Sequence, residues 1–165
     1  SFCISERAFG PRPMDDVPMV HQRREIENGM TMLVTTVTKN RLPVFQDPVK
    51  AREAIDTLYR VQELHPFFLY AFVIMPNHNH FLLNVPAPEK ISTIMRVFKY
   101  GVSVNTGQGK LWQPRYHVRF PDDSRKARNY IHQNPVKAGL ASLPEAIPWS
   151  SASGQWDVSE LLIWI

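Results

Sequence analysis

Short blocks of apolar residues divide this chain into strand-like and helix-like segments. Residues 31–38 are rich in β-branched side chains, which favours a strand. The Asp-Pro pair at 47–48 is a typical helix start, and apolar residues then recur at helical spacing, so the pattern predicts a helix over about 48–64. Two nearly continuous apolar runs, 67–75 and 81–85, are typical of buried strands. They flank a short segment that carries two histidines.

A second amphipathic helix is predicted after Pro88. Apolar residues recur at helical spacing from 91 to 102, while Arg96 and Lys99 lie on a different side. We expect this helix to pack one face against the core and to present cations on another.

One more strand and one more helix follow. Residues 111–120 suit a strand, interrupted by a proline. Asp122 or Asp123 is a suitable cap for a helix that reaches Asn134. We expect Pro135 to stop this helix, because proline lacks the N–H that continues the ladder.

The order of these elements predicts an α+β fold. Two strands separated by only a few residues pair antiparallel, since a parallel pair needs a long crossover. A ferredoxin-like antiparallel sheet with helices packed on it is the natural arrangement. We expect an irregular N-terminal arm over 1–30, one folded domain over 31–152 and a C-terminal tail over 153–165.

Composition narrows the class of protein. The chain has 165 residues, 44% of them hydrophobic and 21% charged, which is typical of one soluble folded domain. It contains neither an apolar run near the ~20 residues of a membrane helix nor a secretory leader, so we expect no membrane partner and a cytoplasmic location. Cys3 is the only cysteine, so a metal would need His, carboxylate or amide ligands.

The distribution of charge indicates where an anion would bind. The formal charge is only +4, but Lys and Arg gather between 96 and 137, where Asp122 and Asp123 are the only acids. A plain solvated basic face would give the same composition.

His78 and His80 are the first candidates for chemistry. In an extended segment their side chains point to one face and that of Asn79 points to the other, so the two imidazoles can chelate one divalent ion. A third ligand must come from elsewhere. Histidines at this spacing are also common without any metal.

Tyr130 and Asn134 are the second candidates. Four residues apart on a helix, a phenol and an amide oxygen point to the same place. Pro135 disfavours helical dihedrals at Asn134, which keeps Gln133 as a rival. Tyr130 as an ordinary core residue is the structural alternative.

Three motifs together resemble a known family. His78-Asn79-His80, the segment LWQPRY at 111–116 and the segment YIHQNPVKAGL at 130–140 resemble the REP-associated tyrosine transposases, relatives of the single-tyrosine HUH transposases. The likeness covers about 30–152, including WSS at 149–151, so the resemblance implies an HUH-type catalytic domain over 31–152.

The resemblance implies roles for these residues. His78 and His80 would be paired metal ligands, Tyr130 the nucleophile and Asn134 the amide ligand, with Mg2+ or Mn2+ as the cofactor. A phenol loses its proton only near pH 10, so such a nucleophile benefits from a cation that polarises the phosphate. In the family the residue between the two histidines is usually hydrophobic, whereas here it is Asn79, which implies either an exposed back face or a looser site.

The activity implied by the resemblance is cleavage and rejoining of single-stranded DNA, on hairpins of REP type. Transesterification would leave a 5′-phosphotyrosine and a free 3′ hydroxyl, and the protein would act as a monomer or homodimer. Cations and flat rings suit single-strand binding. The candidate DNA-binding residues are Arg96, Lys99, Arg115, Trp112 and Arg119. A non-catalytic binder of structured DNA or RNA, and a metal-dependent hydrolase with a structural Tyr130, are the alternatives.

Overall fold

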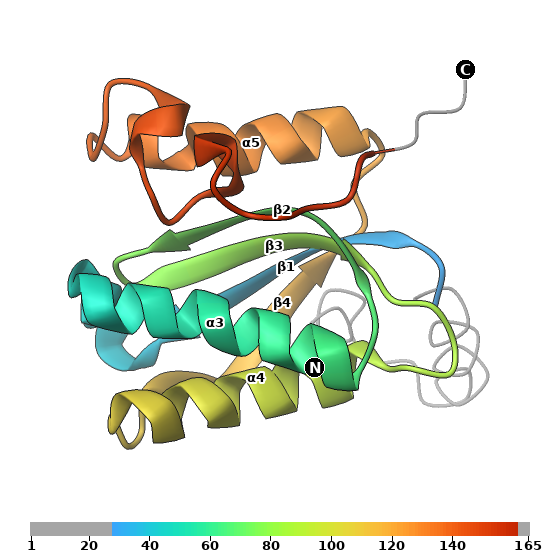
Figure 1. The fold of residues 1–165 in the computed structure, drawn as a ribbon, viewed down its shortest axis with the longest axis horizontal. Helices are drawn as coiled ribbons and strands as arrows, with labels where there is room; N and C mark the ends of the chain where they lie inside the picture. The colour runs from blue at the N-terminus through green and yellow to red at the C-terminus, as the bar shows by residue number, and fades with distance from the viewer. Residues whose placement is uncertain (1–27, 162–165) are drawn as a thin grey trace, which may run out of the picture.

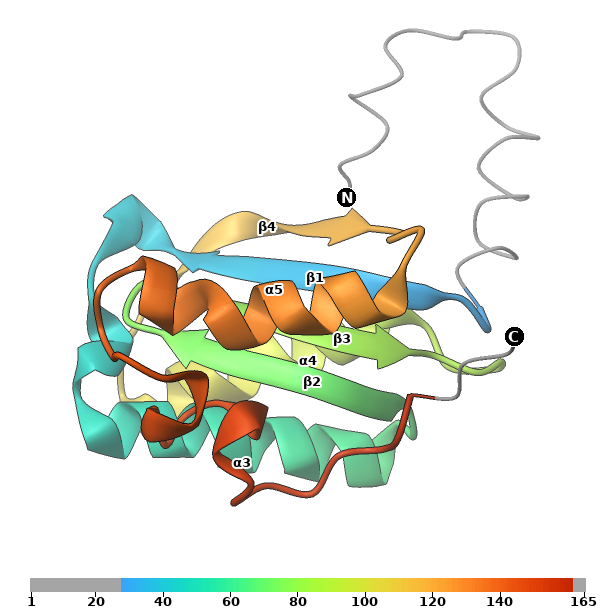
Figure 2. The same cartoon turned by 90° about the horizontal axis from the view of Figure 1, so that it is seen from above.

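The computed structural model describes residues 28–161, which form one four-stranded antiparallel sheet and three α-helices. The strands are β1 (Thr31–Thr38), β2 (Phe68–Met75), β3 (His78–Asn84) and β4 (Trp112–Arg119). The helices are α3 (Pro48–Leu64), α4 (Ile91–Thr106) and α5 (Ser124–Lys137). The strands lie in the order β2-β3-β1-β4 (Figure 2).

Helices cover both faces of the sheet. Figure 1 shows α3 and α4 on one face and α5 on the other. Successive side chains of β3 point to opposite faces of the sheet. Phe81 and Leu83 belong to the core under α3 and α4, whereas Leu82 belongs to the smaller core under α5. The even-numbered residues of β3, including both histidines, therefore face α5.

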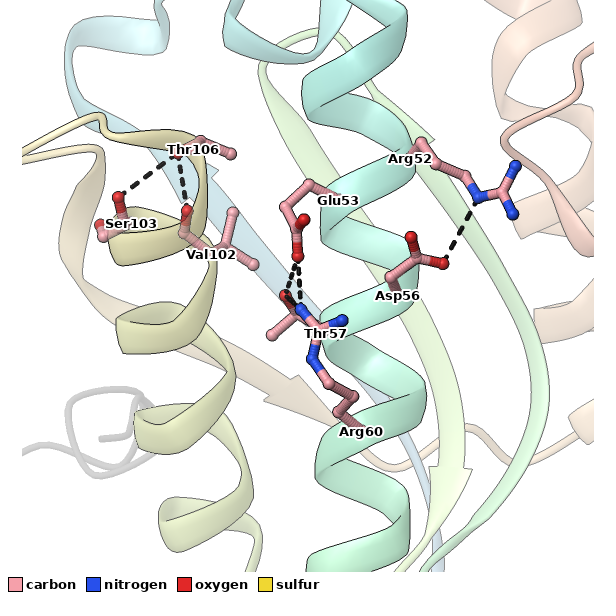
Figure 3. A network of polar contacts seen from close by, with 8 residues as sticks. All are labelled: Arg52, Glu53, Asp56, Thr57, Arg60, Val102, Ser103 and Thr106. Atoms are coloured by element: carbon pink, nitrogen blue, oxygen red, sulfur yellow. Dashed lines mark hydrogen bonds and ion pairs between the residues drawn. The ribbon is translucent and has the colours of Figure 1, made fainter.

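The two helices of the larger layer approach each other closely at Gly101 of α4. A Cβ at this position would lie 2.9 Å from Cγ2 of Thr57 on α3, so the glycine permits the approach. Figure 3 shows the Thr57 side chain in a polar network on α3, where its hydroxyl and the Arg60 guanidinium both donate to the Glu53 carboxylate. These bonds hold Thr57 in the orientation that meets Gly101.

The α+β fold with an antiparallel sheet, predicted from the pattern, is confirmed, as are the bounds of β1 and α3. Asp47 caps α3 as expected, since its carboxylate accepts the N–H of Val49 at 2.9 Å. β3 begins earlier than the apolar run that predicted it. The histidines therefore belong to the strand itself.

The predicted end of the last helix is wrong. Pro135 lies inside α5, which continues to Lys137. Pro135 is buried on the same side as Ile131, one turn earlier, and the N–H groups of Ala138 and Leu140 close the last turn on the carbonyls of Asn134 and Pro135. This packing and these bonds offset the missing proline N–H. Of the two predicted caps, Asp123 is the one used.

Most of the predicted arm, residues 1–27, lies outside the described residues, as do residues 162–165. At the other end, the chain after α5 returns along β2: the N–H of Ile74 donates to Trp149 at 2.9 Å, and that of Ser159 donates to Leu69 at 2.8 Å. The tail boundary at 153 stays a prediction. Between residues 28 and 161, no helix has the length and apolar character needed to cross a membrane.

Candidate active site

The site lies on the face of the sheet covered by α5. His78 and His80 of β3 stand side by side, with ring centroids 4.8 Å apart. The Tyr130 ring of α5 meets His80 edge-on at a centroid distance of 5.4 Å. Tyr130 is still 41% exposed, so its hydroxyl group is accessible from solvent. One strand and one helix thus bring the two imidazoles and the phenol together.

Both imidazole rings are oriented by neighbours through their Nδ1 atoms. His80 Nδ1 lies 2.8 Å from the Thr35 hydroxyl oxygen, and Thr35 is directly opposite His80 in the β1–β3 register. His78 Nδ1 lies 2.7 Å from the amide oxygen of Asn77. With Nδ1 of each ring engaged in this way, Nε2 is the atom that can bind a metal.

The third predicted ligand lies on the last turns of α5. Because the helix runs through Pro135, Asn134 keeps helical geometry one turn after Tyr130. The Asn134 side chain forms a hydrogen bond with His78, whereas Gln133 is exposed. The structure therefore brings Asn134, and not Gln133, to the histidine pair.

Electrostatics keep the two histidines neutral. Burial lowers the pKa of His78; the Asn134 hydrogen bond opposes this shift and the Arg41 guanidinium adds to it. Burial, with smaller contributions from His78 and Arg119, lowers the pKa of His80 to about 3. A neutral imidazole has a free lone pair, so both rings are ready to bind a metal at neutral pH without releasing a proton.

The donor set suits a divalent cation that accepts imidazole and amide ligands. Within the described chain, no cluster of three or more His, Cys, Asp or Glu side chains has a metal-binding arrangement. A cation at this site would thus rely on His78, His80 and the amide oxygen of Asn134. Water or phosphate oxygens would complete its coordination.

Comparison with known proteins decides the family. Residues 27–134 match the family described as "Transposase IS200 like". The chain belongs to this family of transposases. The matched segment contains both histidines, Tyr130 and Asn134.

Individual relatives agree with this assignment. A REP-associated tyrosine transposase of Escherichia coli strain K12 is 30% identical over 98 residues, which make up 57% of this chain and 59% of that protein. The chain thus matches somewhat more than half the length of this curated relative. The sequence-based resemblance to REP-associated tyrosine transposases is confirmed.

Two solved structures share the fold of this IS200-like transposase chain. A REP-associated tyrosine transposase bound to a REP hairpin superposes with a TM-score of 0.69 at 24% identity, covering 79% of this chain and 84% of the other. A putative transposase from Deinococcus radiodurans superposes with a TM-score of 0.51 at 21% identity, covering 68% of this chain and 92% of the other.

Only one of the predicted DNA-binding residues lies at the site in the described part of the chain. This residue is Arg119, which lines a pocket with Tyr130 and whose charge lowers the pKa of His80. Arg96 and Lys99 belong to α4, on the opposite side of the sheet. The Lys99 ammonium donates to the carbonyls of Gln113 and Arg115 on β4. A DNA-binding role for Arg96, Lys99, Arg115 and Arg119 stays a prediction.

Trp112, the candidate for stacking on bases, is partly buried. It contacts Phe45 and Phe98 at centroid distances of 5.6 and 5.9 Å, and its indole N–H donates to the Lys99 carbonyl at 3.0 Å. These contacts pack the partly buried Trp112 against the core under α3 and α4, and its role in stacking on bases stays a prediction.

Sequence reasoning missed the residues that support the site. Thr35 and Asn77 orient the histidines, and the pattern gave no sign of either, since both read as ordinary strand and turn residues. His132 was also missed; its Nε2 lies 2.9 Å from the hydroxyl of Ser151, which anchors α5 to the segment after it. The WSS segment at 149–151, whose last residue is Ser151, was the one sequence feature that pointed to the contact with His132.

Proposed function

We propose that this chain cleaves and rejoins single-stranded DNA with Tyr130 as the nucleophile. The observation that carries the proposal is the placement of Tyr130 against His80, on the same face as His78 and Asn134. Membership of the IS200-like transposases supports a DNA substrate. An exposed phenol beside two neutral, oriented imidazoles and an amide is a suitable arrangement for phosphoryl transfer to tyrosine.

The reaction is a transesterification. The Tyr130 oxygen attacks the scissile phosphorus, its proton passes to solvent, and the bond between phosphorus and the 3′ oxygen breaks. The leaving 3′ oxygen of the upstream strand takes up a proton, and the phosphate stays joined to the tyrosine and to the 5′ oxygen of the downstream strand. Mg2+ or Mn2+ held by His78, His80 and Asn134 would polarise the phosphate and stabilise the charge that develops on it.

Rejoining follows the same path in reverse, with a free 3′ hydroxyl attacking the phosphotyrosine. Because the covalent link conserves the phosphodiester energy, no nucleotide cofactor is required.

The proposed substrate is single-stranded DNA next to a hairpin. A relative named as a REP-associated tyrosine transposase and a structural neighbour bound to a REP hairpin support this choice. Tyr130, His78, His80 and Asn134 all come from one chain, so we propose that the site is completed in cis, as in a protein that acts as a monomer.

Adduct formation tests this function. A hairpin oligonucleotide with a randomised single-stranded flank, labelled at its 3′ end, is incubated with the protein and Mn2+. We expect a labelled band that survives denaturation, that is lost in EDTA and that is absent from Tyr130→Phe. Tyr100→Phe is the matched control, because Tyr100 is an exposed tyrosine on α4, across the sheet.

Other outcomes decide between the alternatives. Binding of the hairpin without any adduct would favour a non-catalytic binder. Cleavage without an adduct would favour a hydrolase in which Tyr130 is structural.

A further inference from the structure

A pocket opens beside Tyr130, where β4 ends and α5 begins. Its volume is about 510 Å3, which falls within the roughly 300–1,000 Å3 range of small-ligand sites. Leu33 of β1, Arg119 and Phe120 at the end of β4, and Lys126 of α5 line it together with Tyr130. The pocket thus shares the Tyr130 side chain with the proposed active site.

Two cations of the pocket are available for an anion. Arg119 and Lys126 are both exposed, and neither forms an ion pair with another residue in the described range 28–161. Asp122 and Asp123 also line the pocket, and the Asp123 carboxylate accepts the N–H groups of Arg125 and Lys126 at the start of α5. A phosphodiester beside Arg119 and Lys126 would place one negative charge between them and accept charge-assisted hydrogen bonds from both side chains.

The rest of the lining is apolar and suits a flat ring. Leu33 and Ala127 belong to the buried core under α5, and Phe120 packs against the core on the other side of the sheet. Phosphate alone would leave this surface unused. A nucleobase would cover it, and an acceptor such as Asp122 can bind the amino group of a base.

We propose that this pocket binds the nucleotide next to the scissile phosphate, with the base against Leu33 and Phe120 and the flanking phosphodiester against Arg119 and Lys126. The inference rests on the proposed cleavage of DNA by Tyr130 and names a subsite for it. Only an unstacked nucleotide can enter such a pocket, which accounts for a single-stranded flank at the cleavage point.

Photocrosslinking tests the pocket without requiring catalysis. The probe is the hairpin oligonucleotide carrying 5-iodouracil at one flank position at a time, bound to Tyr130→Phe protein in EDTA. We expect one position to crosslink to the tryptic peptide 120–125, which contains Phe120. Binding of the same oligonucleotide with an abasic site at that position should be about tenfold weaker.

Salt dependence tests the cations. Lys126→Gln should make the slope of log affinity against log salt shallower by about 0.7, the value for one phosphate contact on single-stranded DNA. Arg125→Gln is the matched control, because it removes the same charge from the neighbouring residue, which does not line the pocket. We expect its slope to equal that of the unmodified protein.

The proposal is overturned if no flank position crosslinks to 120–125, if no abasic site weakens binding, or if Lys126→Gln and Arg125→Gln have the same salt slope. Loss of the covalent adduct would overturn the Tyr130 chemistry instead. The two failures are distinguishable because the crosslinking uses Tyr130→Phe in EDTA and the salt slopes measure binding alone, so neither needs an adduct.

Discussion

Asn79 occupies an unusual environment for an amide. It lies between the two histidines on β3 but faces α3 and α4, where it is fully buried. Neither its amide oxygen nor its amide nitrogen forms a hydrogen bond within the described residues, and the same holds for the hydroxyl of Thr36, its cross-strand partner on β1. The sequence-based alternative of an exposed back face is therefore wrong. Buried polar groups without partners destabilise a fold.

Removing these polar atoms should stabilise the protein. Thr36→Val keeps the shape of the side chain and deletes its unpaired hydroxyl, so we expect the free energy of unfolding to rise by about 1 kcal/mol. Asn79→Leu should raise it by about 1–3 kcal/mol. Urea denaturation measures both changes.

Thr35→Val is the matched control on the same strand. It makes the same chemical change, but the Thr35 hydroxyl is bonded to His80, so this variant should lose stability. A loss of stability in both Thr36→Val and Asn79→Leu would contradict the assignment of unpaired polar atoms to this position.

Single substitutions also distinguish Asn134 from Gln133 as the third metal ligand. Asn134→Ala removes the side chain bonded to His78, so we expect Mn2+ to bind at least about tenfold more weakly. Gln133→Ala, one residue away and exposed, should bind Mn2+ as the unmodified protein does. Isothermal titration calorimetry with Mn2+ measures both affinities. A larger loss in Gln133→Ala would move the third ligand by one position.

At the scale of elements, the position of α5 depends on the segment after it. Ser151 is buried between the two: its hydroxyl contacts His132 of α5, accepts the N–H of Phe72 at 3.0 Å and lies 3.3 Å from the Phe72 carbonyl. Phe72 belongs to β2, one of the two edge strands of the sheet. The serine therefore connects the helix that carries Tyr130 to the sheet that carries the histidines.

Ser151→Ala should displace α5 as well as weaken the fold. We expect a loss of about 1–3 kcal/mol in the free energy of unfolding, because buried partners are left without a hydrogen bond. We also expect slower adduct formation on a DNA substrate that binds with nearly unchanged affinity. Single-turnover cleavage and anisotropy binding measure the two quantities separately.

Ser153→Ala provides the comparison, since the Ser153 hydroxyl only accepts a local N–H from Gln155 at 3.3 Å. It should resemble the unmodified protein in both measurements. Equal effects of the two substitutions on the cleavage rate would show that Ser151 does not position α5.

The predictability of each element follows from how local its determinants are. α3 was predicted within its bounds because Asp47 and Pro48 start it through their own chemistry. The end of α5 was not, because Pro135 acts against the helix locally while its burial beside Ile131 is a tertiary effect. The contact between His132 and Ser151 likewise depends on the path of the chain after α5.

At the scale of the whole molecule, the sheet separates residues that are close in sequence. The alternation rule correctly placed His78 and His80 on one face, and helical spacing correctly placed Tyr130 and Asn134 one turn apart. Of the basic residues expected to surround the same site, Arg119 lies beside Tyr130, whereas Arg96 and Lys99 belong to α4, which lies across the sheet from α5 (Figure 1). Sequence proximity cannot show which face of a sheet a helix covers.

The proposed reaction leaves a covalent bond between Tyr130 and the 5′ phosphate of the cleaved DNA. Mass spectrometry of the trypsin-digested adduct, after nuclease trimming of the DNA, tests it most directly. Cleavage after Arg128 and Lys137 releases the peptide 129–137, whose only tyrosine is Tyr130. We predict that this peptide carries the nucleotide through a 5′-phosphotyrosine. A nucleotide on the peptide 100–110 or 116–119, or cleaved DNA with no modified peptide, would contradict the account.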